Sequence, residues 1–313
     1  MVNKKTNAVL AKYGVGIVLL GMVMINATIT PNFVHINTLW NILLQSFPVM
    51  MIAIGMTFVI STGGIDISVG STMALSSIVL AKFLIFNNTP FGVSLALALG
   101  AALLFGLFNG VLVGVFKFQP IVATLILMIS GRGIAQLFND GVVISFYGDT
   151  YAAIGLYRIG GIIPVQVAII AVVAVLALFI LKRTTFGCYI QAVGDNIRAS
   201  YLAGINTILV IISVYVISAL LSGLAASFET MRMLSADPNN IGKAIELDCI
   251  AAVAVGGTSM SGGRAKIIGT IIGTLIMQLI TTMVNMNNVP YAFSLIIKSA
   301  IIVFALYLRK DAL

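Results

Sequence analysis

Long apolar runs recur along almost the whole 313-residue chain, and they limit the folds that it can adopt. A helix needs about 20 consecutive apolar residues to cross the hydrocarbon core of a bilayer. Hydrophobic residues make up 60% of the chain and charged residues only 8%, which is too little charge to cover a soluble protein of this size. We therefore predict an all-α, polytopic membrane protein with a single transmembrane domain over residues 1–313.

Turn residues and charges divide the apolar sequence into about ten predicted spans. The expected boundaries are 13–30, 38–62, 69–86, 92–116, 120–138, 163–181, 205–228, 247–261, 266–286 and 291–308. The first run follows three lysines, as a signal peptide does, but it is long and has no evident cleavage site. We predict that it is retained as a helix. An even number of crossings then places both termini on one side of the membrane.

The basic residues indicate which side that is. Cytoplasmic loops of membrane proteins are enriched in lysine and arginine. If the termini are cytoplasmic, the inner segments carry eleven basic residues and the outer segments four. The inner residues are Lys4, Lys5, Lys12, Lys117, Lys182, Arg183, Arg198, Arg264, Lys266, Arg309 and Lys310. The outer residues are Lys82, Arg158, Arg232 and Lys243. This bias predicts N- and C-termini in the cytoplasm. Because the charges flank apolar spans, the expected surroundings are membrane lipid, and no nucleic-acid partner is predicted.

The two cysteines fall at opposite ends of predicted spans. Cys188 lies on the predicted inner side and Cys249 near the outer end of its span. The two sides of a bilayer core are about 30 Å apart, whereas a disulfide requires Cα atoms within about 7 Å of each other. We expect two free thiols.

A short polar segment, residues 184–206, separates two long apolar spans on the predicted inner side. It follows Lys182 and Arg183 and has the composition of an amphipathic helix. A helix in this position is suited to docking a cytosolic protein in a groove of that partner. We therefore interpret this segment as a partner-binding element and not as an active site.

The pattern Gly-Gly-x-x-x-Ser-x-Gly occurs twice, at residues 63–70 and 256–263. Its recurrence in the same predicted orientation indicates an internal parallel repeat, as in many transporters, although a chance match in a glycine-rich chain is the alternative. Adjacent glycines let the backbone leave helical geometry, and Ser68 and Ser261 are predicted to cap the next helices. Asp66 is expected either to bond to the start of the following helix or to act in gating. These turns either line the inner end of a pathway or are plain tight turns.

Several polar residues interrupt the apolar spans. Arg132 and Lys298 must face the protein interior, water or an interface, because a charge in hydrocarbon is costly. Arg132 is expected to bond either to a hydroxyl-rich solute or to backbone carbonyls. The candidate residues of a translocation path or gate are Gly63, Gly64, Asp66, Ser68, Asn109, Arg132, Gln136, Gly256, Gly257 and Ser261. Two glycine stripes are expected to pack against neighbouring helices, namely Gly106, Gly110 and Gly114, and Gly269 and Gly273.

Motifs for catalysis are absent from the sequence. It contains no Gly-x-x-x-x-Gly-Lys-Ser/Thr phosphate loop, no cluster with metal-ligand spacing and no nucleophile elbow with acid and base partners. We therefore predict that the chain is not an enzyme, carries no catalytic residue and binds neither a cofactor nor a metal.

Three segments, 57–70, 192–206 and 246–264, resemble the permease subunits of bacterial ATP-binding-cassette sugar importers of the ribose, xylose, arabinose and galactofuranose group. Residues 118–136 and 236–240 look most like the galactofuranose-type permeases. The resemblance implies a multi-pass protein of the bacterial inner membrane. It also implies three protein partners: a second permease copy or paralogue, a cytosolic ATPase that uses ATP and Mg, and an extracytoplasmic sugar-binding protein.

In this family the polar segment is the coupling helix that enters a cleft of the ATPase. The resemblance assigns ATPase coupling to Gly194, Asp195, Asn196, Arg198, Ala199, Ala203 and Gly204. The implied function is ATP-driven import of a monosaccharide, galactofuranose or a related pentose or hexose. The alternative is a stand-alone facilitator or an ion-coupled secondary carrier for a small polar solute. The shortage of carboxylates inside the spans counts against ion coupling.

Overall fold

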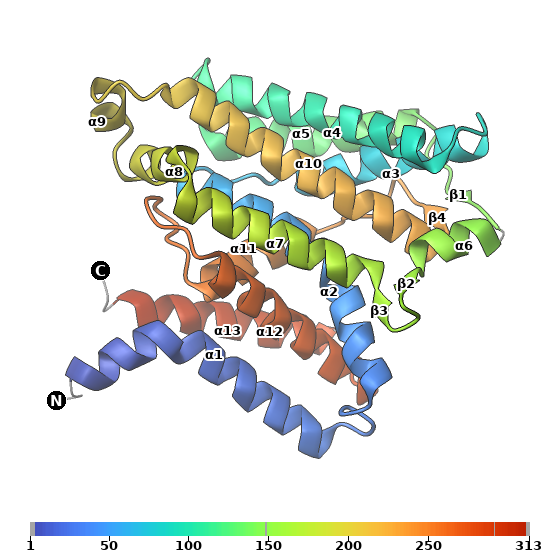
Figure 1. The fold of residues 1–313 in the computed structure, drawn as a ribbon, viewed down its shortest axis with the longest axis horizontal. Coiled ribbons are helices and arrows are strands. Elements are labelled where there is room, and N and C mark those ends of the chain that lie inside the picture. Colours follow the sequence, from blue (N-terminus) through green and yellow to red (C-terminus); the bar gives the residue numbers. More distant parts are fainter. Residues whose placement is uncertain (1–3, 148, 291, 311–313) are drawn as a thin grey trace.

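The computed structural model describes residues 4–147, 149–290 and 292–310, and the chain is mostly helical there (Figure 1). The side chains of Lys4, Lys5, Lys12, Arg309 and Lys310 lie outside the described residues. The helices are α1 (Lys4–Ile29), α2 (Ile36–Ser61), α3 (Val69–Ile85), α4 (Phe91–Gly114), α5 (Pro120–Leu137), α6 (Asp149–Gly155), α7 (Val165–Arg183), α8 (Thr185–Asp195), α9 (Ile197–Leu202), α10 (Thr207–Met233), α11 (Ile245–Gly256), α12 (Ile267–Met286) and α13 (Ala292–Lys310).

Four two-residue strands join the loops at the end of the molecule opposite α8 and α9 (Figure 1). β1 (Ile144–Ser145) pairs with β4 (Ser235–Ala236), and β2 (Arg158–Ile159) pairs with β3 (Ile163–Pro164), both antiparallel. The first pair ties the segment after α5 to the segment after α10.

Six of the described helices are long and apolar enough to cross a membrane: α2, α4, α5, α7, α10 and α12. α3 and the apolar parts of α1 and α13 are shorter. The predicted polytopic helical membrane protein is therefore confirmed, whereas the number of ten crossings stays a prediction. One boundary was wrong: the span predicted at 247–261 ends as α11 at Gly256. Gly257 takes φ of +96°, a left-handed conformation that terminates a helix.

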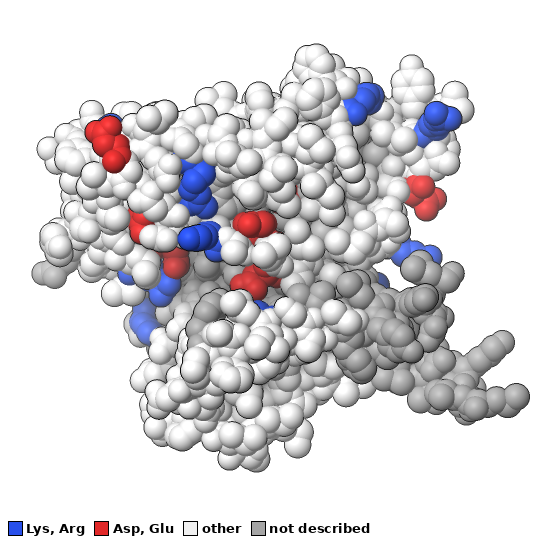
Figure 2. Space-filling model, turned by 180° about the vertical axis from the view of Figure 1, so that it is seen from behind, with Lys and Arg blue, Asp and Glu red and all other residues white. Residues whose placement is uncertain are grey.

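The long helices run side by side, so that the molecule has two distinct ends (Figure 1). The start of α1 and the end of α13 lie at the same end as α8 and α9 (Figure 1). This arrangement fits an even number of crossings, and the cytoplasmic location of that end stays a prediction. Seen from behind, the surface is largely uncharged, and its acidic and basic side chains lie mostly toward the left of the view, with a few more at the right (Figure 2).

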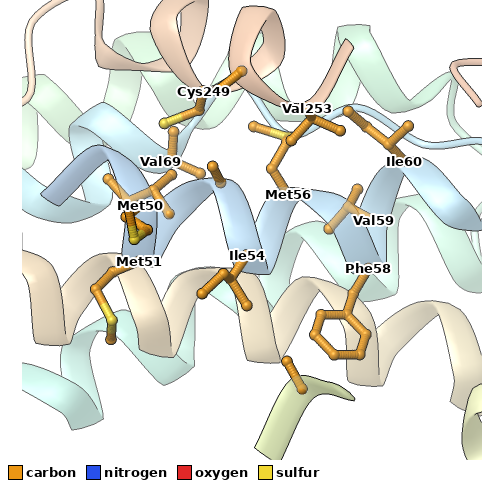
Figure 3. Close-up of a cluster of buried hydrophobic side chains, with 14 of the residues drawn as sticks. Met50, Met51, Ile54, Met56, Phe58, Val59, Ile60, Val69, Cys249 and Val253 are labelled. Atoms are coloured by element: carbon orange, nitrogen blue, oxygen red, sulfur yellow. The ribbon is translucent and has the colours of Figure 1, made fainter. Parts of the chain in front are cut away.

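The core is built around α2, whose residues from Met50 to Ser61 are all buried. A helix that is apolar on all sides belongs in the interior. Its side chains, among them Met50, Ile54 and Phe58, pack in a cluster that also includes Cys249 and Val253 of α11 (Figure 3). Helices α10, α11 and α12 pack against α2, so the centre of the fold joins its first and second halves.

The glycine stripes bring helices into backbone contact, as predicted. A Cβ added to Gly106 or Gly110 of α4 would lie 2.8 Å from a Cα atom of α10, that of Val216 or Ile212 respectively. Gly269 and Gly273 of α12 face the backbone of α11 in the same way. Small residues allow such close approach. Close packing contributes much to helix association in a membrane, because lipid is apolar and the hydrophobic effect does not drive helices together there. Both cysteines are free, Cys188 exposed and Cys249 buried, which confirms the prediction of two thiols.

Candidate functional site

The polar segment between α7 and α10 forms two short helices, α8 and α9, where one was predicted. Asn196 separates them because it takes an extended conformation, and its Oδ1 accepts the backbone N–H of Ala199 at 3.0 Å. Thr184 caps α8 through Gly187 at 3.3 Å, and Asn206 caps α10 through Leu209 at 3.1 Å. Three side-chain caps therefore fix the shape of the segment.

Most of the predicted coupling residues are exposed at this end of the molecule. They are Asp195, Asn196, Arg198, Ala199, Ala203 and Gly204. Beside them, Tyr201 and Leu202 of α9 expose 71% and 84% of their surface. Sequence analysis missed these two residues, although two adjacent large apolar residues in a polar segment indicate a possible contact surface for a partner. Exposed apolar side chains gathered on one short helix are typical of an interaction surface.

Gly194 differs from the other coupling candidates, because it faces the protein. A Cβ at this position would overlap the carbonyl oxygen of Ser61 at the end of α2 and lie 2.5 Å from the backbone nitrogen of Gly263. The N–H of Gly263 donates to that same Ser61 oxygen at 3.0 Å. Gly262, with φ of +91°, packs on the backbone of Gly194 from the other side. We call Ser61, Gly194, Gly262 and Gly263 the backbone junction.

The backbone junction brings together three segments that are distant in the sequence: the end of α2, the end of α8 and the loop from α11 to α12. The two Gly-Gly-x-x-x-Ser-x-Gly turns meet there, since a Cβ on Gly63 would lie 3.9 Å from the carbonyl oxygen of Ser261. In the second turn, Gly256 contacts Gly269, and Gly257 ends α11. The two turns are therefore adjacent both to each other and to the predicted coupling segment.

The predicted capping roles of Ser68 and Ser261 are wrong. Ser68 has helical backbone angles, φ −83° and ψ −4°, in place of the extended conformation that a capping side chain requires. The Asp66 carboxylate accepts the backbone N–H of Ser68 at 3.0 Å, which confirms its predicted contact with the start of the helix. Ser261 lies five residues before Lys266, the residue that precedes α12, and its hydroxyl is 3.0 Å from that of Ser259.

Asp66 is the centre of a buried polar network between α2 and α3. Its Oδ1 accepts the Ser68 hydroxyl at 2.6 Å, and its Oδ2 accepts the Ser218 hydroxyl of α10 at 3.0 Å. Asn109 of α4 donates to the Ser68 oxygen at 2.8 Å. Among the described residues, no basic side chain forms an ion pair with Asp66. Hydrogen bonds from hydroxyl groups and a backbone amide therefore hold this buried carboxylate in place.

Tyr215 of α10 borders the same network. Its hydroxyl is buried without a partner among the described residues, as is the Asn109 Oδ1. A Cβ on Gly64 would lie 2.7 Å from the Tyr215 oxygen. The turn after α2 thus rests on α4 and α10. In this structure Asp66, Ser68 and Asn109 are interior residues, and their role in a path or gate stays a prediction.

Arg132 bonds to backbone carbonyls, the second of the two alternatives for this residue. Its guanidinium donates to the carbonyl oxygens of Pro238 at 3.1 Å, Ile241 at 2.7 Å and Gly70 at 3.3 Å. It therefore links α5, the start of α3 and the segment between α10 and α11.

Gln136 extends this link one turn further along α5, where its amide donates to Asn239 Oδ1 at 2.8 Å. The neighbouring Asp237 accepts two backbone N–H groups, those of Asn239 and Asn240. Partial burial opposes ionisation of Asp237, but these bonds, the Asn240 side chain and the charge of Arg132 together hold its pKa below the usual value. Arg132 and Gln136 thus fix the linker between α10 and α11, residues 234–244.

Comparison with known proteins identifies relatives over nearly the whole chain. The family model described as branched-chain amino acid transport system / permease component matches residues 38–306. The ribose import permease protein RbsC of Escherichia coli K12 is 40% identical, over 92% of this chain and 90% of its own. The galactofuranose transporter permease protein YtfT of the same organism is 35% identical, over 94% and 88%.

A more distant relative is the D-allose transport system permease protein AlsC of Escherichia coli K12, which is 32% identical over 96% of this chain and 91% of its own. No solved structure matches the chain. The family match and the apolar helices identify a multi-pass inner-membrane protein. The chain therefore belongs to the family of transport-system permease components that includes the permeases of sugar importers.

Proposed function

We propose that this chain is the membrane-spanning subunit of an ATP-driven importer and that it translocates a monosaccharide across the bacterial cytoplasmic membrane. The observation that carries the proposal is the backbone junction, in which the end of α8 contacts both the end of α2 and the second glycine turn. A helix that docks an ATPase can drive transport only if its displacement is transmitted to the membrane-spanning helices. The contacts of the backbone junction provide that connection.

The proposed mechanism uses contacts that leave no space to absorb a displacement. An ATPase would dock on the exposed surface of α8 and α9. Closely packed interiors transmit strain, and Gly194 contacts the backbone of Ser61 and Gly263 without intervening side chains. Movement of α8 would thus shift the ends of α2 and of the loop before α12 together, and so rock the spans as rigid bodies.

The proposed assembly contains a second permease copy or paralogue, a cytosolic ATPase that uses ATP and Mg, and an extracytoplasmic sugar-binding protein. Support for this assembly comes from the relatives' names, which state import of ribose and transport of galactofuranose and D-allose. Identity of 40% to the ribose permease and 35% to the galactofuranose permease does not separate these cargoes. The proposal for galactofuranose or a related sugar rests on residues 118–136 and 236–240.

The test is reconstitution of the chain in liposomes with and without its ATPase and sugar-binding protein. We expect uptake of a radiolabelled monosaccharide only when both partners and MgATP are present. Uptake by the chain alone would contradict the proposal and favour a facilitator or an ion-coupled carrier. Affinity purification from native membranes gives a second readout, because a carrier would bring no ATPase with it.

A further inference from the structure

A cavity of about 100 Å³ lies between α2, α11, α12 and α13. Five of the residues that line it are polar or charged: Asp248, Thr274, Gln278, Thr281 and Lys298. A space of this size holds several waters when its walls offer hydrogen-bond partners. The feature that requires an explanation is the concentration of polar groups in an otherwise apolar region.

An ion pair forms one wall of this cavity. Lys298 Nζ of α13 lies 2.9 and 3.0 Å from the two carboxylate oxygens of Asp248 of α11. The lysine side chain is 8% exposed and the aspartate side chain 32%. Because Asp248 keeps about a third of its surface free, the pair is open to the cavity on the side of the carboxylate.

The other polar groups come from a single face of α12. Thr274 and Thr281 donate their hydroxyl protons to backbone carbonyls of their own helix at 3.0 and 3.2 Å, so each oxygen keeps lone pairs for a further donor. The amide nitrogen of Gln278 donates to Gln45 of α2 at 3.0 Å and to Thr282 at 3.4 Å, which leaves its carbonyl oxygen as an acceptor. The cavity therefore offers several acceptors together with the ammonium donor of Lys298.

The cavity lies about halfway along α12 and beside the first turn of α11. Gly256 and Ala252 of α11 contact Gly269 and Gly273 of α12, and Asp248 reaches the cavity one turn further along. Gln278 is eleven residues from the start of α12 at Ile267, which corresponds to roughly 16 Å at 1.5 Å per residue, about half of a 30 Å hydrocarbon core.

Charged groups at this depth cannot face lipid without a large cost. An aqueous path, and not hydrocarbon, is the surrounding that such groups require.

We propose that Asp248, Lys298, Gln278, Thr274 and Thr281 form a contact site for a neutral polyhydroxylated solute on the transport path. The site rests on the proposed function and names the side chains that the cargo touches. Each hydroxyl of a monosaccharide is both a donor and an acceptor, so it matches a wall that presents both kinds of group. A passing sugar exchanges the waters of the cavity for its own hydroxyls.

The first test is thiol accessibility in the assembled transporter, in a background that carries Cys188→Ala and Cys249→Ala. Gln278→Cys and Thr281→Cys are treated with a charged, membrane-impermeant methanethiosulfonate. Leu104→Cys is the control, since Leu104 is 67% exposed on α4 among apolar residues and faces lipid in the proposed arrangement. We expect the cavity thiols to react at least about tenfold faster than the control in one nucleotide state, because reaction requires access to water.

The second test separates a contact site from a structural ion pair. Asp248→Asn and Gln278→Leu are compared with Ser299→Ala, whose hydroxyl bonds only to its own helix. Uptake of ribose, allose and fructose is measured in the full complex. A contact site predicts a changed ratio of rates among the sugars and a higher KM, whereas a structural role lowers all rates equally.

Failure of the proposed function and failure of the proposed contact site give different results in these experiments. If the wild-type complex imports no sugar, the proposed function fails, and labelling of Gln278→Cys still reports on the cavity. If import is normal but Gln278→Cys and Thr281→Cys react no faster than Leu104→Cys in any nucleotide state, the contact site is wrong. Unchanged sugar ratios in both Asp248→Asn and Gln278→Leu would also overturn it.

Discussion

The backbone N–H of Gly263 donates to the carbonyl oxygen of Ser61 at 3.0 Å, and this bond joins the loop before α12 to the end of α2, about 200 positions apart in the sequence. Gly194 packs directly over the bond, with no space for a Cβ. The end of α8, inside the predicted coupling segment, thus touches the end of α2 and the second glycine turn through backbone atoms alone. The predictions below follow from this arrangement and from the polar network beside it.

Gly194→Ala is expected to disturb the backbone junction, because the added methyl group overlaps the Ser61 oxygen. Overpacking of this kind costs about 1–3 kcal/mol. The variant should melt at a lower temperature in detergent and lose sugar-stimulated ATP hydrolysis. Gly133→Ala is the matched control, since nothing lies within 4 Å of a Cβ there. Normal coupling in Gly194→Ala would show that the junction does not transmit movement.

Most contacts of the backbone junction could not be predicted from the sequence. The glycine turns, the polar segment and the glycine stripes were predicted from local patterns, because each depends on neighbouring residues. The contact among Ser61, Gly194 and Gly263 depends on how α2, α8 and α12 pack together. No local sequence pattern predicts this packing. The break at Asn196 was readable, since asparagine is a preferred N-cap. The capping role given to Ser68 failed because Asp66, two residues earlier, accepts the backbone N–H.

Asp66→Ala is expected to destabilise the protein, because three hydrogen bonds to the carboxylate disappear and leave buried donors on Ser68 and Ser218. Unsatisfied buried donors cost about 1–3 kcal/mol each. The measurement is the thermal midpoint of the detergent-purified chain. Gln119→Ala, at an exposed position with φ of −59° and no capping hydrogen bond from its side chain, should leave the midpoint unchanged. An unaltered midpoint in Asp66→Ala would argue against the network as an anchor of the turn between α2 and α3.

Leu202→Asp is expected to weaken binding of the ATPase without changing the stability of the chain, because Leu202 is 84% exposed and has few packing contacts to lose. Central apolar residues of an interface contribute 2 kcal/mol or more, about a 30-fold change in Kd. The measurement is ATPase retained on the purified permease at increasing concentration. Tyr147→Ala, an equally exposed change outside α8 and α9, is the control. Equal retention in both variants would remove α9 from the interface.

Replacing Ala203 or Gly204 with a bulky residue is expected to uncouple transport while leaving membrane insertion intact. Both residues are exposed, and Gly204 takes φ of +83°, which a side chain rarely adopts. Gly204→Leu should therefore change the course of the chain between α9 and α10 and displace the docking surface. Sugar-dependent ATP hydrolysis in the complex measures the effect. Normal hydrolysis in Gly204→Leu would contradict the coupling assignment.

The central claim is that α8 and α9 lie on the cytosolic side, where an ATPase can reach them. Cys188 of α8 is exposed and serves as a native probe, whereas Cys249 is buried. A membrane-impermeant maleimide should label Cys188 in inverted membrane vesicles and leave it unlabelled in intact cells, with Cys188→Ala as the blank. Labelling of Cys188 from outside intact cells would contradict the account.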